Sequence, residues 1–459
     1  MSLPNKWRLN GPLAQNVVMG VVLFCLPGIY LALTGLGAGG GGPSALQVAI
    51  ETNAILYGLF AVFGWVGGVI LNIVKPRVAV IVGGVGYPLY VGRTVLGFTA
   101  SCLWTAAGYI AWTYPEEKDK GKFIALQWGM TSLGGTVGGA IAFGVSVNRT
   151  AVTGVSSGVY IAFIAIMCFA MVVAGLLLKH PAEILRDDGT HLAEFKPTNM
   201  HREFKNFVTI IFDWKILVLT PAFFAAEMCL SIVSSLNSYY FNLRTRSLNN
   251  MLFQFIMIVA SVCLSLLLDF DKLSRRKRGI IGIGIVSVIT IGACSGLIGW
   301  MTVYGLDGRL PEPPAVDWTD PRFAGGVCLY LLWGIVFSTY LVGASWVVAS
   351  LSNDPVKVAF YSGFTKGTAS LGLCICFIMD SQQVTYMRQA IAMFVIYTVG
   401  SVSLLYVIIY HMKDSDYFLE EDVVVPVHVL QEKGKVVESI DDVERVEEVE
   451  GANDRKNSS

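Results

Sequence analysis

The sequence contains little charge for its length. Asp, Glu, Lys and Arg make up 14% of the 459 residues, whereas an average soluble domain carries about 25%. Hydrophobic residues make up 54%, and the mean hydropathy is +0.61. The 33 basic residues balance the 33 acidic ones, so no net charge and no basic face are available to bind nucleic acid. The composition therefore excludes a soluble globule and indicates a multi-pass integral membrane protein in a lipid bilayer.

The chain is also poor in histidine, and its five histidines all lie outside the long apolar runs. This excludes a histidine proton relay within the membrane, and no HExxH or haem-binding pattern is present. The nine cysteines lie inside apolar runs, which is typical of small buried side chains rather than of a disulfide framework or a zinc site. No nucleophile–base pair stands out in the sequence. We therefore predict no catalytic residue, no metal site, no cofactor and no enzymatic activity.

Twelve apolar segments are long enough to cross a bilayer, whose hydrocarbon core of about 30 Å requires about 20 helical residues. The predicted spans are 15–36, 47–73, 76–91, 94–114, 122–147, 155–178, 216–240, 248–268, 279–303, 323–350, 357–379 and 389–410. We predict an all-α integral membrane protein whose twelve transmembrane helices form two six-helix bundles. The predicted divisions are an N-terminal bundle over 1–178, a connecting loop over 179–215, a C-terminal bundle over 216–410 and a tail over 411–459.

Lysine and arginine are distributed unevenly among the predicted loops. If the N-terminus lies inside, the inner loops carry 19 of these residues and the outer loops carry 7. Positively charged loops favour the cytosolic side, so we predict cytosolic N- and C-termini and a cytosolic connecting loop. From His411 onward the chain carries 14 acidic and 6 basic residues, and we predict that this tail is disordered.

Asn148, Arg149 and Thr150 form a glycosylation sequon on the predicted outer side. Asn148 is therefore a candidate glycosylation site, and the alternative is that the tripeptide is unused. Its position close to the membrane favours the alternative.

A similar pattern follows the second and the eighth predicted spans. In each, a small residue is followed four positions later by a polar residue and then by basic residues. Such a polar side chain at a helix end can hold the basic loop and the N-terminus of a neighbouring helix, as a latch. The alternative is ordinary positive charge on the inner side. The latch candidates are Gly68, Asn72, Lys75 and Arg77 in the first half and Asp269, Arg275 and Arg276 in the second.

Six spans, a cytosolic connection, six further spans and a repeated basic loop resemble the major facilitator superfamily. That resemblance implies two parallel repeats packed around a central cavity. Asn72 departs from the superfamily signature, which usually has an aspartate there, and this weakens the predicted latch in the first half. Asp269 keeps the aspartate in the second half.

Three strings resemble one branch of the superfamily, the uncoordinated-ninety-three-type (ion-channel regulatory protein) family. They are LWTAAG at 103–108 followed by YPEE at 114–117, YFNLRTRSLN at 240–249, and LSNDP at 351–355. The resemblance extends to about residue 410 and implies a transporter-like fold. Members of the family are described both as solute carriers and as regulators of other membrane proteins.

The segment 76–114 is short for two spans, because only 40 residues separate Lys75 from Glu116 and both are predicted to lie inside. Two spans of about 20 residues use all of that length. Either the hairpin turns tightly near Arg93, or the chain lacks a segment that related proteins have here.

Few ionisable residues lie inside the predicted spans, and two of them are placed at similar depth. Glu227 lies 11 residues beyond Ile216 and Lys366 lies 9 beyond Lys357, which puts them roughly 16 Å and 13 Å along their helices. A lone charge at such a depth costs several kcal/mol, and such residues usually face a cavity or each other. The helices that correspond to these two spans are neighbours in the superfamily fold. We predict that Glu227 and Lys366 bind a charged substrate group or a coupling proton; the alternative is a buried pair that only fixes helix packing.

Other polar and aromatic residues are weaker candidates for the same site. Asn237, Tyr239 and Trp346 lie in the neighbouring spans, and Glu51 and Asn53 lie near the outer end of the second span. The favoured function is secondary transport of a small solute by alternating access of the two bundles. The alternative is a membrane regulator or adaptor that does not transport and that binds another membrane protein. The sequence leaves the solute, the coupling ion and the membrane open.

Overall fold

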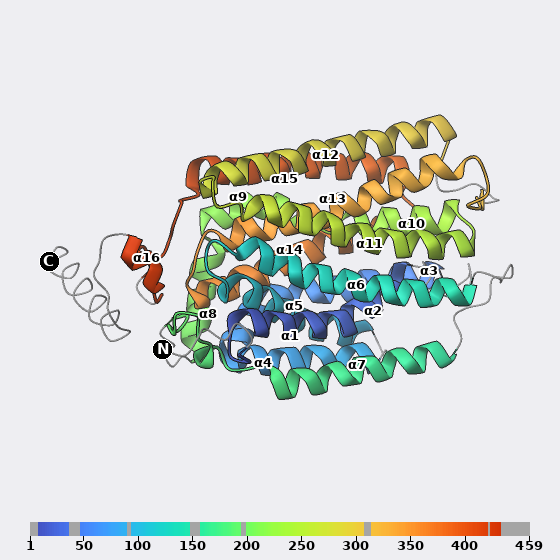
Figure 1. Ribbon diagram of the computed structural model, residues 1–459. Helices are drawn as coiled ribbons and strands as arrows, with labels where there is room; N and C mark the ends of the chain where they lie inside the picture. Colours follow the sequence, from blue (N-terminus) through green and yellow to red (C-terminus); the bar gives the residue numbers. More distant parts are fainter. Residues whose placement is uncertain are drawn as a thin grey trace.

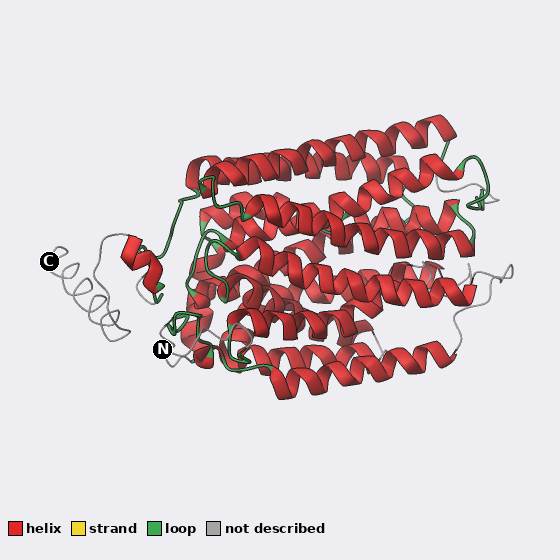
Figure 2. Ribbon diagram, in the orientation of Figure 1, coloured by secondary structure: helices red, strands yellow, loops and turns green. Residues whose placement is uncertain are grey.

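The protein is a bundle of long helices that lie side by side (Figure 1). The computed structural model describes residues 8–35, 46–89, 93–146, 157–193, 199–306, 314–420 and 423–432. Among these residues the regular structure is helical, and strand-like pairing is limited to three isolated bridges (Figure 2). The predicted all-α fold is therefore confirmed for the described part of the chain.

The helices follow the predicted spans closely. The first part of the chain forms α1 (Pro12–Leu23), the π-helical turn η1 (Phe24–Gly28), α2 (Ile29–Gly35), α3 (Leu46–Trp65), α4 (Gly67–Leu89), α5 (Arg93–Thr113), α6 (Lys120–Ser146) and α7 (Ser157–Leu177). The connection contains the 3-10 turn η4 (Pro181–Glu183) and the amphipathic α8 (Met200–Ile211). The second part forms α9 (Trp214–Ala225), α10 (Cys229–Tyr240), α11 (Leu243–Leu268), α12 (Arg275–Tyr304), α13 (Phe323–Ala349), α14 (Pro355–Ser381), α15 (Tyr386–His411) and α16 (Val427–Glu432).

Ten helical stretches within these described ranges are long and apolar enough to cross a membrane, and 161–177 of α7 is a shorter apolar helix. Their polar ends are set by side chains that accept hydrogen bonds from the first free backbone N–H groups. Asn242 accepts from the N–H of Thr245 at the start of α11, and Asp354 accepts from the N–H of Val356 at the start of α14. Long apolar segments with polar caps thus become helices of bilayer length.

Three helices are interrupted, and each interruption has a local cause. Pro27 lies in η1, where its missing N–H breaks the α-helical ladder and widens the turn. Lys75 has φ 67° and ψ 159° inside α4, which separates 67–74 from 76–89 as predicted for the second and third spans. Residues 226–228 form a turn between α9 and α10, and Pro221 lies one turn earlier.

Helix α6 packs on both parts of the chain through two stripes of glycine. A Cβ atom on Gly138 would lie 2.6 Å from the Cβ of Ala32 in α2, and one on Gly139 would lie 3.2 Å from the Cα of Met251 in α11. Small residues allow backbones to approach closely in membrane helices. Helix α6 therefore lies between its own neighbours and α11 of the second part.

Two large apolar clusters form the interior. One contains mainly residues from 216–412, and the other contains residues from 18–192 together with Ala359. Helices of the two parts meet along α6 and α11 and along α3 and α14. The two parts of the chain thus contact each other along these two pairs of helices.

Several short elements gather at one end of the bundle, which we call the α8 end (Figure 1, left). The start of α1, the turn after α7, α8 and α16 all lie there, and the backbone O of Glu183 accepts a hydrogen bond from Asn10. The prediction of a disordered tail from residue 411 is wrong for its first part. Tyr417 and Leu430 are buried, with 4% and 1% of their surface exposed, because apolar residues interrupt the acidic composition there.

Candidate functional site

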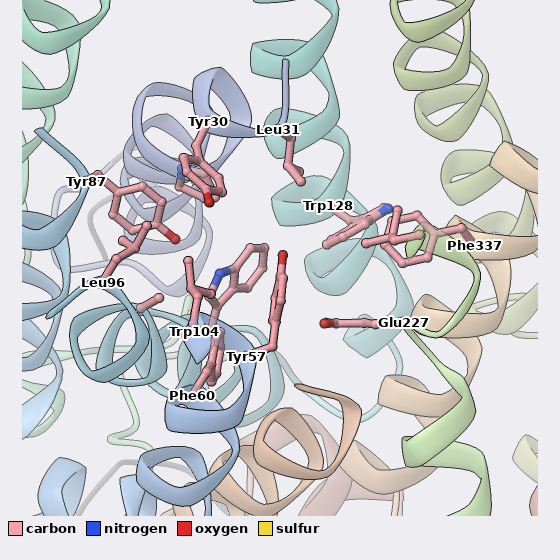
Figure 3. Close-up of a pocket in the computed structure, with 14 residues that line it drawn as sticks. Tyr30, Leu31, Tyr57, Phe60, Tyr87, Leu96, Trp104, Trp128, Glu227 and Phe337 are labelled. Atoms are coloured by element: carbon pink, nitrogen blue, oxygen red, sulfur yellow. The ribbon is translucent and has the colours of Figure 1, made fainter. Parts of the chain in front are cut away.

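A cavity lies between helices from both parts of the chain (Figure 3). Its empty volume, counted with the space that is open to the outside, is about 530 Å³. We call it the aromatic cavity, because rings dominate its lining. It is lined by Pro27, Tyr30, Leu31, Leu56, Tyr57, Phe60, Tyr87, Leu96, Ala100, Trp104, Trp128, Glu227, Leu230 and Phe337.

Glu227 lies at the break between α9 and α10, and its carboxylate points toward Tyr57 (Figure 3). The backbone turns here through short-range hydrogen bonds, such as that from the N–H of Leu230 to the O of Glu227. Membrane transporters often build binding sites from such discontinuous helices. The side chain of Glu227 is 15% exposed, so it faces the cavity from an otherwise buried position.

Lys366 lies on α14, and its Nζ is 4.0 Å from Oε1 of Glu227. The two predicted site residues are thus brought together, as an ion pair between two helices of the second part. Lys366 is not among the side chains that line the cavity. Its ammonium group lies 4.7 Å from the ring centroid of Trp104 and 5.9 Å from that of Trp128, two rings that do line it. These ring faces stabilise the positive charge behind the cavity wall.

The Glu227 carboxylate has unused acceptor capacity. An ionised carboxylate accepts about four hydrogen bonds, whereas the Lys366 ammonium at 4.0 Å is too distant for one. Among the described residues, no hydrogen bond to the Glu227 carboxylate is formed. A buried carboxylate with open acceptor positions is the principal polar feature of the aromatic cavity.

A second cavity adjoins the first and shares Leu31, Tyr57 and Leu230 with it. Its empty volume is about 540 Å³. Its further lining is more polar and comprises Asn53, Val233, Ser234, Asn250, Phe253, Gln254, Tyr330, Leu373 and Phe377. Asn53, a weak candidate from the sequence, thus lies beside the aromatic cavity rather than in it.

The other sequence candidates lie elsewhere. Asn237 is buried and accepts a hydrogen bond from Asn249 near the end of α10, and it lines a smaller pocket of about 310 Å³. Tyr239 packs its ring against Tyr386. Asn237 and Tyr239 lie 10 and 12 residues beyond Glu227, roughly three helical turns along the chain, and neither lines the aromatic cavity.

Trp346 and Glu51 are also outside the cavity. The indole of Trp346 is fully buried against Gly279 of α12, so it belongs to the packing between helices. Glu51 is exposed and accepts a hydrogen bond from Gln47 one turn earlier. Asn148, the glycosylation candidate, lies outside the described residues.

The first latch segment contacts α8, in the connection between the two parts of the chain, rather than the N-terminus of the next helix. The Asn72 amide donates to Glu203 of α8 at 2.7 Å, and Lys75 donates to the backbone O of Asn72 at 2.7 Å. Arg77 donates to the backbone O of Gly175 in α7. At Gly68 an added Cβ would lie 2.6 Å from the Cα of Phe360, so this glycine permits close contact between α4 and α14.

In the second latch segment, Asp269 ends α11 and accepts hydrogen bonds from two backbone N–H groups at the start of α6. Its carboxylate oxygens lie 2.8 Å from the N of Gly121 and 2.6 Å from the N of Lys122. Its partner is therefore a helix of the first part and not the basic loop that follows α11, which differs from the predicted contact with that loop. Burial raises the pKa of Asp269 to about 6, against the opposing effect of these hydrogen bonds.

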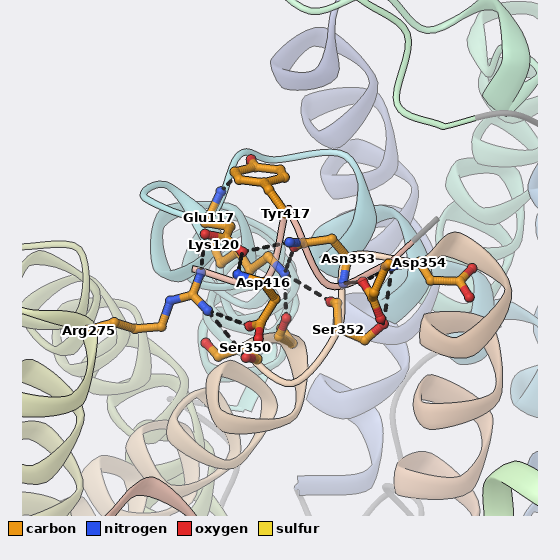
Figure 4. Close-up of polar contacts among 11 residues, drawn as sticks. Glu117, Lys120, Arg275, Ser350, Ser352, Asn353, Asp354, Asp416 and Tyr417 are labelled. Atoms are coloured by element: carbon orange, nitrogen blue, oxygen red, sulfur yellow. Dashed lines mark hydrogen bonds and ion pairs between the residues drawn. The ribbon is translucent and has the colours of Figure 1, made fainter. Parts of the chain in front are cut away.

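Arg275 joins the two parts of the chain at the α8 end (Figure 4). Its guanidinium lies 2.6 Å from Glu117, before α6, and 2.9 Å from Asp416, after α15. The side chain of Arg275 is 2% exposed. Arg276, its neighbour in sequence and the remaining latch candidate, is exposed.

A set of hydrogen bonds extends this contact, and we call Glu117, Lys120, Arg275, Asn353 and Asp416 the interbundle network (Figure 4). Asn353 donates to the Glu117 carboxylate at 2.6 Å, and Lys120 donates to the side-chain O of Asn353 at 2.8 Å. Burial acts to raise the pKa of Glu117, but Arg275 and Lys120 hold it below its ordinary value. Burial raises the pKa of Asp416 despite Arg275.

The segment after α15 crosses this network, and we call residues 412–420 the strap. The N–H of Asp416 donates to Glu117, and the hydroxyl of Tyr417 accepts from the N–H of Glu117. The Glu420 carboxylate accepts hydrogen bonds of 2.6–3.2 Å from the Ser352 hydroxyl, the N–H groups of Asn353 and Asp354, and the Lys357 ammonium. The strap thus contacts both parts of the chain.

Sequence reasoning missed all of the rings that line the aromatic cavity and all of the strap, although a signal for part of them was present. The strings that carry the family resemblance include Trp104, Glu117 and Asn353. The structure brings the last two into direct contact and places Trp104 in the aromatic cavity. The shared strings therefore mark the cavity wall and the interbundle network.

Comparison with known proteins identifies the family. The profile of the family described as Ion channel regulatory protein UNC-93 matches residues 51–264. An uncharacterized membrane protein of Schizosaccharomyces pombe is 41% identical over 398 residues, covering 83% of this chain and 81% of that one. UNC93-like protein 1 of Arabidopsis thaliana is 34% identical over 436 residues, covering 90% and 93%. The chain belongs to the UNC-93 family.

The fold is similar to the folds of two solved membrane transporters. The Escherichia coli fucose:proton symporter has a TM-score of 0.56 at 14% identity, covering 86% of this chain and 99% of that one. The human organic anion transporter MFSD10 has a TM-score of 0.57 at 11% identity, covering 86% and 98%. These likenesses concern the fold alone, and the long apolar helices together with the family confirm a multi-pass integral membrane protein.

Proposed function

We propose that this UNC-93 family member moves a small solute across the membrane by alternating access. The observation that carries the proposal is the buried Glu227 carboxylate, which faces a cavity between the two parts of the chain at a break in a helix. In transporters, the solute site lies where two bundles meet near the membrane midplane. A regulator has no need of a cavity that contains a carboxylate with open acceptor positions.

The proposed topology has twelve transmembrane helices in two six-helix bundles, with the N- and C-termini and the α8 end in the cytosol. The ten long apolar stretches, together with α6 and α7, supply this number. The excess of lysine and arginine in the loops of the α8 end supports the orientation. The interbundle network then closes the cytosolic end, and transport requires it to open.

Uptake into proteoliposomes tests the proposal. The purified chain would be offered radiolabelled sugars, amino acids, monocarboxylates and organic cations, with and without an imposed proton gradient. We expect accumulation of one class, reduced at least tenfold by Glu227→Gln, while the variant keeps the melting temperature of the parent. If no class accumulates, or if Glu227→Gln combined with Lys366→Met leaves accumulation undiminished, the proposed site is wrong.

The second candidate function is regulation of another membrane protein, favoured by the description of the matched family. In that case a partner would be captured irrespective of the cavity. Chemical cross-linking in native membranes, with parent and Glu227→Gln compared, separates the two functions. A partner that binds both equally, together with no uptake of any solute, supports regulation and contradicts transport.

A further inference from the structure

We propose that the aromatic cavity binds an amphipathic organic cation, with one positive charge on an apolar body that carries a ring. The inference rests on the proposed function, since it names the solute class for the same cavity. Three observations carry it: the sign of the charge in the lining, the character of the surrounding rings, and the position of Lys366.

The first observation is the charge. Glu227 is the charged member of the cavity lining, and its carboxylate has no hydrogen-bond donor among the described residues. A buried carboxylate that accepts no hydrogen bond and whose ionic partner lies 4.0 Å away is costly. A ligand cation that reaches the carboxylate from the cavity supplies a closer partner, whereas a ligand anion adds a second negative charge to the same space.

The second observation is the rings. Tyr57, Phe60 and Trp104 line the cavity from the first part of the chain, and Phe337 lines it from the second (Figure 3). The faces of aromatic rings are negative and attract cations, and they also bury apolar surface. A charged head with an apolar body therefore matches both features of the lining, while a strongly hydrated metal cation would find too few oxygen ligands.

The third observation is Lys366, which neutralises Glu227 when the cavity is empty. Its ammonium lies 4.0 Å from the carboxylate and rests on Trp104 and Trp128. Lys366 therefore resembles a ligand cation held on the far side of the cavity wall. A bound ligand competes with Lys366 for the carboxylate, so removal of the lysine charge should strengthen cation binding. At an anion site the same change would abolish binding.

Binding measured by calorimetry in phosphatidylcholine nanodiscs tests the inference without requiring transport. The probes form a matched series: trimethyl(2-phenylethyl)ammonium, neutral 3-phenylpropan-1-ol and anionic 3-phenylpropionate. We expect the cation to bind at least tenfold more tightly than the alcohol, and the anion to bind more weakly than the alcohol. Empty nanodiscs correct for partition into lipid.

Two variants give opposite expected shifts. Glu227→Gln should reduce cation affinity at least tenfold and leave the alcohol unchanged, while Lys366→Met should raise cation affinity severalfold. Glu183→Gln and Lys272→Met make the same chemical changes at exposed positions and should leave all affinities unchanged. The melting temperature of each variant checks that it folds.

The outcomes separate the ligand class from the transport proposal. If 3-phenylpropionate binds best and Lys366→Met abolishes its binding, the cavity is an anion site and the inference is overturned. If the cation and the alcohol bind equally, the carboxylate takes no part and the inference is again overturned. If the cation binds as expected but does not accumulate in proteoliposomes, the ligand class stands and the transport proposal fails.

Discussion

Replacing Arg275 by methionine should open the α8 end of the protein. The guanidinium holds Glu117 at 2.6 Å and Asp416 at 2.9 Å in a position that is 2% exposed. Methionine has a similar length but no charge, so the variant Arg275→Met leaves two carboxylates buried without their partner. Breaking a buried ion pair from one side costs about 3–5 kcal/mol.

The cost applies only while the α8 end is closed, because water solvates the carboxylates once it opens. The closed arrangement therefore loses stability relative to an open one by this amount, which corresponds to a factor of roughly 10² to several times 10³ in their equilibrium. Burial already raises the pKa of Asp416. Protonation of Asp416 therefore reduces the cost of losing Arg275, and we expect an effect near the lower end of this range.

Double electron–electron resonance measures the opening. Spin labels at Lys118, before α6, and at Lys272, before α12, report the separation of the two parts at the α8 end. The exposed cysteines Cys168, Cys263 and Cys328 must first be replaced so that they do not react with the label. We expect the parent protein to show mainly a short distance between the two spin labels. In Arg275→Met a longer distance should dominate.

The neighbouring arginine provides a matched control. Arg276 is exposed, so Arg276→Met should leave the distance distribution unchanged. Adding Glu117→Gln and Asp416→Asn to Arg275→Met removes the uncompensated charges and should restore part of the short distance. Identical distributions for the parent and Arg275→Met would refute the reasoning that this arginine holds the two parts together.

The remaining predictions concern the same interface and the helix contacts around it. Lowering the pH from 7 to 5 should favour the closed α8 end over the open one by roughly tenfold. Burial raises the pKa of Asp269 to about 6 while α6 covers this side chain, so the closed form binds a proton at Asp269 more tightly than the open form does. This stabilisation of the closed form is lost as the pH rises through 6. The resonance distances should lose this dependence in Asp269→Asn, and an unchanged dependence would assign it to another group. Gly363→Ala should lower stability by about 1–3 kcal/mol, since its Cβ would lie 2.7 Å from the backbone O of Gly64, and thermal melting should show no such loss for Gly284→Ala, where nothing lies within 4 Å. Glu420→Gln should speed amide hydrogen exchange in the strap, because its carboxylate joins the strap to the start of α14, and equal exchange in both proteins would contradict that role.

Much of the helical framework was predictable because bilayer length constrains it. The predicted span 323–350 corresponds to α13 at Phe323–Ala349, and 216–240 corresponds to α9 and α10. The similar depth of Glu227 and Lys366 followed from residue number, and the expectation that their helices are neighbours followed from the resemblance to the superfamily fold. Where an element is set by a periodicity or a length, the chain alone is sufficient.

The cavity lining was less predictable, because it depends on how helices rotate about their axes. Trp346 and Trp128 are both tryptophans in apolar spans, yet Trp346 is buried against α12 and Trp128 lines the cavity. Nothing in the local sequence distinguishes these two faces. The partner of Asp269 was likewise hidden, since a helix N-terminus 148 residues away supplies it.

The strap escaped prediction for a different reason. Its acidic residues suggested a solvated tail, but Asp416 and Glu420 are acceptors for groups on the bundle. The composition of a segment gives its own charge but not the charge of the protein surface against which it packs. The α8 end presents arginine, lysine and free backbone N–H groups, and an acidic segment that follows directly from α15 is attracted to it.

The aromatic cavity and the interbundle network are connected by the helices that carry them. Helix α14 begins at the network, where Asp354 caps it beside Glu420, and it carries Lys366 three turns later. Helix α6 begins at Lys120 of the network and carries Trp128 of the cavity two turns later. Because helices of this length move as rigid bodies over a few turns, a ligand that shifts Lys366 from Glu227 also acts on the start of α14. We therefore expect a ligand that occupies the aromatic cavity to favour release of the interbundle network.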